Sequence, residues 1–261
     1  MKPVSGQFKM FMVQSPLASL ASPFGPWHKR SGGRADAMPD FAIERGCAGM
    51  VCGVDEAGRG PLAGPVVAAA VILDRRRFRG ALRRDLDDSK VLTREERETC
   101  YGALLACAKI GAVRIGVGAA STREIDRINI LRASLVAMRR AVASLGITPD
   151  IALVDGNVAP ALPCPVKTIV KGDSLSFSIA AASVVAKVTR DRIMRALACR
   201  YPGYGWTTNV GYSTAQHFDG IGRLGVTPHH RRSFEPVSLA LSGPADLFAL
   251  LESQPLAAAD D

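Results

Sequence analysis

Apolar runs and helical repeats alternate along this chain between turn-rich segments. Short runs of β-branched and other apolar residues predict buried strands, and they lie at residues 50–54, 66–73, 112–118, 151–154 and 166–170. Apolar residues at helical spacing predict three longer helices, which end near Lys109, run from about Ile128 to Leu145, and extend from Ser174 to about Arg200. Strands and helices that interleave in this order favour one α/β domain with a mixed sheet.

Local start signals support two of these helices. Thr93 is followed three residues later by Glu96, and Ser121 by Glu124, so that each pair has the spacing of a capping box. In the last long helix, one face carries the apolar residues Phe177, Ala181, Val184 and Val188, and we expect Lys187 and Arg190 to point away from that face.

Composition changes near both ends of the chain. Residues 1–47 mix Pro, Ser and Gly with scattered apolar residues and show no sustained period, which predicts a disordered N-terminal extension. Residues 48–242 hold the predicted folded domain, which ends in a C-terminal segment rich in Gly, aromatic and basic residues. Residues 243–261 form a tail with an acidic end.

Bulk properties narrow the class of protein. At 261 residues and 48% hydrophobic, the chain can build one sizeable core, and it holds no uninterrupted apolar stretch long enough to predict a transmembrane helix. The six cysteines form no C-x-x-C pair, which argues against structural zinc and is typical of reduced thiols in a cytoplasmic protein. A net charge of +9 favours an acidic partner, of which nucleic acid is the commonest.

The run Asp55-Glu56-Ala57-Gly58-Arg59-Gly60 carries the first candidate chemistry. Two acids at the end of a buried strand, beside an arginine and flexible glycines, suggest a cation site next to a phosphate ester. An ordinary turn is the alternative. A dinucleotide-binding loop fits poorly, because the glycine spacing is wrong and prolines interrupt the helix that must follow.

Acids recur where two further elements begin or end. Asp155 closes a strand and Asp173 opens a helix, so the four carboxylates of Asp55, Glu56, Asp155 and Asp173 are predicted to meet at one edge of the sheet. Such a group repels itself unless cations neutralise it, and two magnesium ions would suit it. A turn role for Asp155 and a cap role for Asp173 remain as alternatives. Glu56 can join Asp55 only if the strand ends or bulges there, because neighbouring strand residues point to opposite faces.

An ordered set of short motifs resembles ribonuclease HII, the bacterial type 2 ribonuclease H. The resemblance runs from about residue 48 to 242 and rests on Asp55–Gly60, Asp88-Ser89-Lys90, Asp155-Gly156-Asn157, Lys171-Gly172-Asp173-Ser174, Ala181-Ala182-Ser183, Ala186–Asp191, Gly211-Tyr212 and His229–Phe234. One departure is Ala180, where this family pattern has a serine.

The resemblance implies an RNase H-like fold and a metal-dependent endonuclease, with residues 48–242 as the catalytic domain and the C-terminal part of that domain as a substrate-binding segment. Its expected substrates are RNA–DNA hybrids and single ribonucleotides embedded in duplex DNA, cut on the 5′ side to leave 3′-hydroxyl and 5′-phosphate ends. The implied metal ligands are Asp55, Glu56, Asp155 and Asp173, which hold Mg²⁺ or Mn²⁺, with two ions in the substrate complex. Gly58, Arg59 and Gly60 would read the 2′-hydroxyl through their backbone, and Tyr212 would stack on the next deoxyribose.

Further expectations are less specific. Lys90, Ser183 and Lys187 are candidate phosphate contacts, although solvated or capping roles suit each as well. His229 and His230 fit a loop pair bonded to backbone or phosphate better than a metal site. We expect a monomer that does not bind membranes, and a sliding-clamp contact stays open. The alternative function is a catalytically silent nucleic-acid-binding module, which the four acids disfavour because phosphate repels them.

Overall fold

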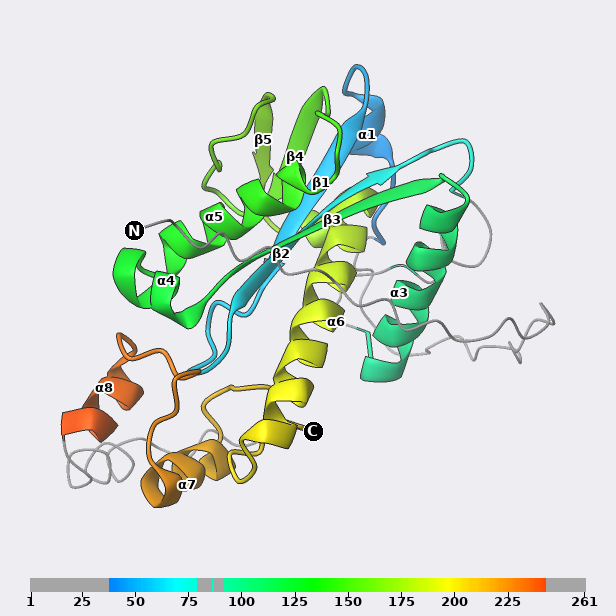
Figure 1. The fold of residues 1–261 in the computed structure, drawn as a ribbon. Helices are drawn as coiled ribbons and strands as arrows, with labels where there is room; N and C mark the ends of the chain where they lie inside the picture. The colour runs from blue at the N-terminus through cyan, green and yellow to red at the C-terminus, as the bar shows by residue number, and fades with distance from the viewer. Residues whose placement is uncertain (1–37, 79–85, 87–91, 243–261) are drawn as a thin grey trace, which may run out of the picture. The chain divides into compact units, whose positions relative to one another are not determined.

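Five strands form one mixed sheet in the order β3-β2-β1-β4-β5 (Figure 1). They are β1 Val51–Ala57, β2 Val66–Leu73, β3 Val113–Ala120, β4 Ile151–Asp155 and β5 Val166–Ile169. β2 is antiparallel to both β1 and β3, whereas β1, β4 and β5 run parallel to one another. The computed structural model describes residues 38–78, 86 and 92–242, which lie within one unit, Asp36–Asp261. All five predicted strands are therefore confirmed.

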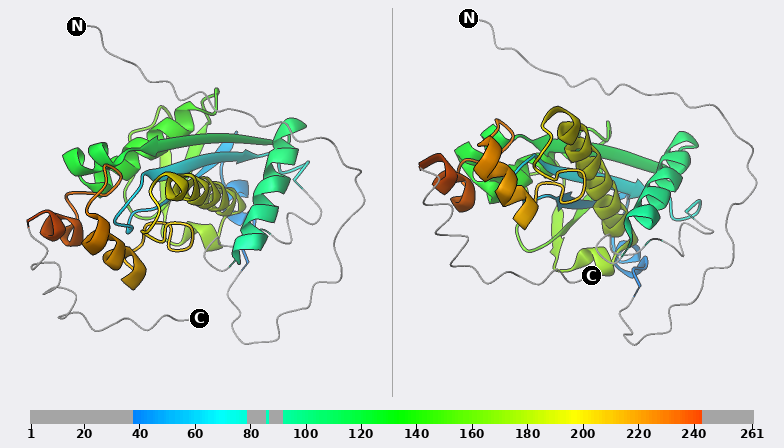
Figure 2. Two further views of the ribbon diagram at one scale, coloured as in Figure 1. Left: turned by 60° about the horizontal axis from the view of Figure 1, so that its bottom comes forward. Right: turned by 90° about the horizontal axis from the view of Figure 1, so that it is seen from below.

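Helices cover both faces of this sheet (Figures 1 and 2). Helix α5, Ile130–Ala143, packs with α4, Thr122–Ile128, on one face, where Val54, Ala68 and Ala137 belong to one apolar cluster. Helix α6, Phe177–Arg200, and α3, Arg94–Lys109, pack on the other face against Ala69 and Val71. β2 is buried along its whole length because it lies between the two layers.

Both predicted capping boxes are present. Thr93 and Glu96 begin α3, and Ser121 and Glu124 begin α4, each with the two reciprocal hydrogen bonds of the motif. α4 and α5 are separate helices because Asn129 has a φ of 65° and uses its side chain to cap the Arg132 amide. The second long helix therefore begins at Ile130.

Helix α6 is buried on nearly every side. A 3₁₀ turn, η1 Gly172–Ser174, leads into it, and Ser176 caps its first turn. The apolar face predicted from Phe177 to Val188 is buried as expected. Arg190, which the pattern places away from that face, is also fully buried, because the helix continues under the C-terminal segment.

The C-terminal segment adds a third apolar cluster at one end of the sheet. Helix α7, Ala215–Leu224, lies beside the end of α6, and helix α8, Glu235–Ser242, lies beyond α7 (Figures 1 and 2). Trp206 is the largest side chain buried there, and Tyr204 stacks on it. This segment also contacts the loop between β1 and β2 through Leu62 and Ala63.

The structure differs from the predicted N-terminal extension at residues 38–47. Helix α1, Ala42–Arg45, is folded against the domain, and Phe41 packs on Phe177. One carboxylate oxygen of buried Glu44 accepts hydrogen bonds from the Ser176 hydroxyl and from the hydroxyl and amide of Ser178. Sequence reasoning missed this because the segment is too short to show a period. Residues 1–37 and 243–261 lie outside the described residues.

Two further expectations concern the whole chain. Within the part of the chain that the structure describes, no helix has the length and apolar character needed to span a bilayer. All six cysteines fall among the described residues, and all are free thiols.

Candidate metal centre and adjoining loops

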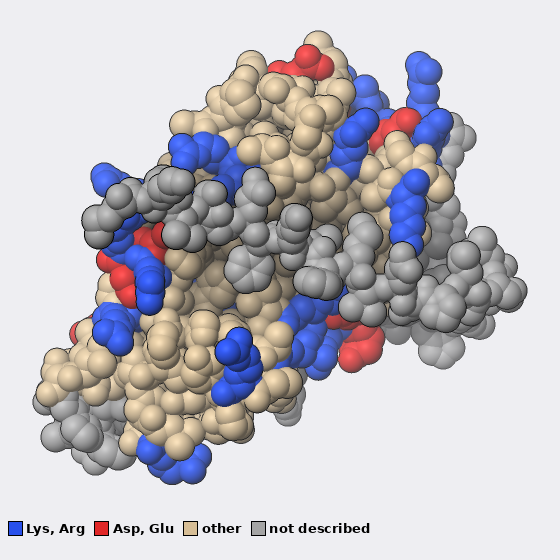
Figure 3. Space-filling model, viewed as in Figure 1, with Lys and Arg blue, Asp and Glu red and all other residues tan. Residues whose placement is uncertain are grey.

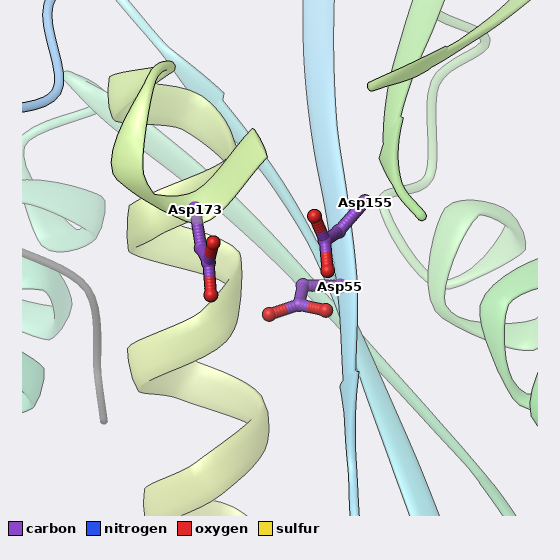
Figure 4. Close-up of side chains that lie close together, drawn as sticks. All are labelled: Asp55, Asp155 and Asp173. Carbon is purple, nitrogen blue, oxygen red and sulfur yellow. The ribbon is translucent and has the colours of Figure 1, made fainter. Parts of the chain in front are cut away.

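Three aspartates from different elements meet at the edge of the sheet. Asp55 comes from β1, Asp155 from the end of β4 and Asp173 from η1, and their side chains point toward one another (Figure 4). One carboxylate oxygen of each lies within 4.8 Å of the others. Among the described residues, these three form the group of acids, cysteines and histidines that is close enough to share an ion.

Strand register explains why these acids converge. Val54 pairs with Val154 in the parallel β1–β4 ladder, so Asp55 and Asp155 are neighbours on the same face of the sheet. η1 is tied to β4 because the Gly172 amide donates to Asp155 Oδ1 at 2.7 Å. The preceding residue, Lys171, has a φ of 56°, which turns the chain so that Asp173 faces the two strands.

The carboxylates of the cluster lie close together, so their negative charges repel one another. Burial, followed by the charges of Glu56 and Asp155, raises the pKa of the Asp55 carboxyl well above its usual range. A hydrogen bond from the Ser183 hydroxyl of α6 partly opposes this shift. Excess negative charge held by backbone and side-chain donors fits a hard divalent cation, which prefers carboxylate oxygens.

Glu56 lies on the opposite face of the sheet from Asp55. β1 continues without a bulge through Glu56, opposite Ala68, to Ala57, opposite Val67, so the strand neither ends nor bulges at Glu56, and the condition for Glu56 to join Asp55 on one face is not met. Glu56 lines a cavity of about 60 Å³ together with Asp155 and residues of α5, and its carboxylate pairs with Arg59 at 3.4 Å. Burial raises the pKa of Glu56 above its usual value. The charge of Arg59 opposes this shift, and the charge of Asp155 adds to it. Asp155 therefore lies near both carboxylates.

The loop after β1 turns its carbonyl groups toward buried Arg231. This guanidinium donates to the Gly58 and Arg59 carbonyls, the latter at 2.7 Å, and its Nε donates to the Gly64 carbonyl at 3.0 Å. Burial, then the charge of Arg190, lowers the pKa of Arg231 to about 9, so it stays protonated at neutral pH. The loop carrying Gly58, Arg59 and Gly60 is thus anchored through its carbonyls.

Tyr212 lies beside this loop. A Cβ atom at Gly60 would be 3.8 Å from Cε1 of the Tyr212 ring, and the residue Tyr212 is 43% exposed. The Lys187 ammonium lies 5.7 Å from the ring centroid. The structure therefore places Gly60 and Tyr212, which are far apart in the sequence, next to each other.

A buried pair of histidines supports the backbone of Tyr212. His217 Nδ1 is 2.8 Å from the Tyr212 carbonyl, so that nitrogen carries a proton and donates. His217 Nε2 then has one lone pair, which the Trp206 indole N–H at 3.0 Å shares with His230 Nε2 at 3.1 Å. His230 Nδ1 accepts from the Thr227 amide. The expectation that His230 is bonded to backbone is confirmed.

The three residues predicted to contact phosphate differ in their surroundings. Ser183 is buried against Asp55, and Lys187 pairs with Asp191 at 3.0 Å on the same helix. Lys90 lies outside the described residues.

Sequence reasoning assigned no role to three buried residues next to the loops: Arg190, Arg231 and His217. A sequence signal existed for Arg190, because it lies in a row of every fourth residue whose other members, Ala186, Met194 and Ala198, are apolar, and the structure buries all four.

Comparisons with known proteins identify the family. The family model for ribonuclease HII matches residues 52–237. Ribonuclease HII of Rhodospirillum rubrum is 58% identical over 205 residues, which cover 78% of this chain and 93% of the relative. The crystal structure of ribonuclease H2 from Pyrococcus horikoshii OT3 matches with a TM-score of 0.61 and 29% identity, over 74% of this chain and 97% of that one.

A second solved structure, the PCNA:RNase HII complex from Archaeoglobus fulgidus, matches with a TM-score of 0.56 and 26% identity, over 70% of this chain and 93% of that one. The match to the family model covers most of the described domain, including the strands that carry Asp55 and Asp155. The chain therefore belongs to the ribonuclease HII family of RNase H-like fold, and it is a metal-dependent ribonuclease H, an endoribonuclease of RNA–DNA hybrids.

Proposed function

We propose that this enzyme also incises duplex DNA on the 5′ side of a single embedded ribonucleotide, leaving 3′-hydroxyl and 5′-phosphate ends. The observation that carries the proposal is that Gly60 lies beside the Tyr212 ring. Gly60 belongs to the loop that follows β1, the strand that carries Asp55. A backbone loop that can sense a 2′-hydroxyl thus lies next to an aromatic ring that can sense the following sugar.

The acids of the cluster would hold Mg²⁺ or Mn²⁺, with two ions in the substrate complex. Asp55, Asp155 and Asp173 supply the oxygens that lie together, and Glu56 adds a carboxylate from the other face near Asp155. The raised pKa of Asp55 supports this assignment, because uncompensated charge is what a divalent cation relieves. When bound, the cations activate water and stabilise charge on the leaving oxygen.

Residues of the two loops would position the junction. Arg231 draws the carbonyls of Gly58 and Arg59 inward, which leaves backbone of the Gly58–Gly60 loop to approach the ribose. Tyr212 would stack on the next deoxyribose, where a ribose would crowd the ring with its own 2′-hydroxyl. Junction selection would then arise from sugar shape on both sides of one phosphate.

Basic side chains would attract the phosphate backbone of the duplex independently of its base sequence. Figure 3 shows Lys and Arg side chains dispersed over the face that it views, in keeping with the net charge of +9. Lys187 would contact a phosphate beside Tyr212, and Ser183 would support Asp55 or a phosphate next to it. Lys90 keeps its predicted phosphate role from sequence alone.

The enzyme would act as a monomer. Among the solved relatives, the Archaeoglobus fulgidus protein forms a complex with PCNA, which supports a sliding-clamp contact for this chain as well.

Cleavage of defined duplexes tests the proposed function. One labelled strand carries a single ribonucleotide, a second is all DNA, and a third is all RNA paired with DNA. With Mg²⁺, the first should be cut once, 5′ of the ribonucleotide, and the all-DNA duplex should stay intact. Cleavage of the RNA hybrid without incision at the single ribonucleotide would contradict the proposal, and binding without any cleavage would indicate a silent binding module.

A further inference from the structure

Arg190 joins the two loops that flank the candidate junction site. It comes from α6 and is fully buried, and its guanidinium donates only to backbone carbonyls in the bonds that the structure gives it. Nη2 donates to Ala63 at 3.0 Å and Nε to Pro65 at 3.1 Å, both in the loop after β1. Nη1 donates to Val210 at 3.0 Å, in the loop that ends at Tyr212. One planar group therefore sets the separation of two loops that are distant in sequence.

The first loop fits closely over Arg190. Gly58 has a φ of 93°, and a Cβ atom added there would lie 1.9 Å from Arg190 Nε. The backbone of the glycine loop thus rests directly on the guanidinium, and any larger residue at position 58 would push the two apart. The height of the loop above α6 is therefore fixed by contact with Arg190.

The second loop holds an unfavourable conformation at the residue that Arg190 binds. Val210 has a φ of 41°, which is rare for a β-branched side chain and persists only where neighbouring bonds enforce it. Arg190 holds the Val210 carbonyl, and the Asn209 side chain accepts from the Gly211 amide at 2.9 Å. The strained turn places Tyr212, and Arg190 Cζ lies 6.0 Å from the ring centroid.

We propose that Arg190 is a positioning residue that fixes the distance between the Gly58–Gly60 backbone and the Tyr212 ring, and thereby sets the preference for an RNA-to-DNA step. This inference rests on the proposed function above. Lysine cannot replace it, because an ammonium group lacks the planar fork that reaches carbonyls of both loops at once. Cleavage within a continuous RNA strand depends less on this distance, since no deoxyribose has to fit against Tyr212.

The test compares two substrates on one preparation of each variant. For Arg190→Lys, kcat/KM is measured on the single-ribonucleotide duplex and on the all-RNA hybrid, and the ratio of the two values is the readout. Any inactive fraction of protein cancels in that ratio, so a purely structural role would not move it. We expect the ratio to fall by about tenfold or more. Arg192→Gln is the matched control, because Arg192 is an exposed residue of the same helix paired with Glu98, and its ratio should stay at the wild-type value.

Different results would overturn the role of Arg190 and the proposed function. An unchanged ratio in Arg190→Lys, with wild type showing a clear junction preference, would overturn the inference and leave the proposed function intact. A wild-type enzyme that fails to incise the single-ribonucleotide duplex would instead overturn the proposed function. If Arg190→Lys is unfolded by circular dichroism, it is assayed with trimethylamine N-oxide, which favours compact states. A variant that stays unfolded there would also overturn the inference, because Arg190 would then serve global folding.

Discussion

Asp55 and Glu56 are neighbours in the chain, yet their carboxylates lie on opposite faces of the sheet. Asp55 faces α6, where Ser183 contacts it, whereas Glu56 lines a cavity with residues of α5. Asp155 is common to both surroundings, since it belongs to the aspartate cluster and also lines that cavity. This arrangement suggests that the two acids serve different cations on either side of Asp155.

The number of Mn²⁺ ions that each variant binds should distinguish the role of Asp55 from that of Glu56. In Glu56→Gln, the three clustered aspartates remain, so the protein should still bind one Mn²⁺ although its cleavage activity falls. In Asp55→Asn, a charged carboxylate of the cluster becomes a neutral amide, which is a weaker ligand, and this binding should weaken by about tenfold or more. Isothermal titration calorimetry of both variants with Mn²⁺ provides the measurement. Equal loss of Mn²⁺ binding in the two variants would show that the acids share one ion.

Truncation tests the part played by residues 38–47. A chain that begins at Met38 should match the full-length protein in melting temperature and cleavage rate. A chain that begins at Ala48 loses Phe41 and Glu44, and we expect about 2–4 kcal/mol less free energy of unfolding. Urea titration of the three proteins measures this. Equal stability of the two truncated proteins would refute a structural role for this segment.

The buried histidines predict a loss of stability in mild acid. Burial, then the charges of His217 and His229, lowers the pKa of His230 to about 3. The pKa of a histidine in the unfolded chain is 6.5. The unfolded chain therefore gains a proton below pH 6.5 that the folded chain does not take up until far lower pH. The contribution of His230 is fully present above pH 6.5 and is lost as pH falls, by up to about 1.4 kcal/mol per pH unit.

His230→Gln removes this linkage. Free energies of unfolding measured by urea titration at pH 7, 6 and 5 should fall more steeply for wild type than for the variant. Parallel pH profiles would mean that His230 is protonated to the same degree in both states.

Tyr212 provides a direct test of sugar recognition. Tyr212→Phe keeps the ring and should be mild, whereas Tyr212→Ala removes the surface that orients the deoxyribose and should lower kcat/KM on the single-ribonucleotide duplex by about tenfold or more. The ratio of kcat/KM on that duplex to kcat/KM on an all-RNA hybrid reports the effect. If Tyr212→Ala changes neither the ratio nor the rate, the ring has no role at the junction.

Sequence patterns predicted the strands, the two capping boxes and the convergence of acids, because each depends on local periodicity or on the rule that strand ends meet. The sequence left open whether Glu56 shares a face with Asp55, because that depends on where β1 ends, and only the continuous ladder with β2 shows that it does not. The roles of Arg190 and His217 depend on which carbonyls approach them in three dimensions, and no spacing in the chain encodes that. The four-residue row on α6 could have indicated that Arg190 is buried, but the burial of His217 depends on how the C-terminal segment folds beside α6.

The central claim is that the aspartate cluster performs metal-dependent incision at a ribonucleotide, and Asp155→Asn tests it most directly. This change removes one negative charge but keeps the size of the side chain, and an amide oxygen can still accept from Gly172. With a labelled duplex holding one ribonucleotide and saturating Mg²⁺, the account predicts a loss of turnover of about 100-fold or more, with duplex binding and melting temperature retained. Near-normal incision by Asp155→Asn with undiminished Mg²⁺ dependence would contradict it.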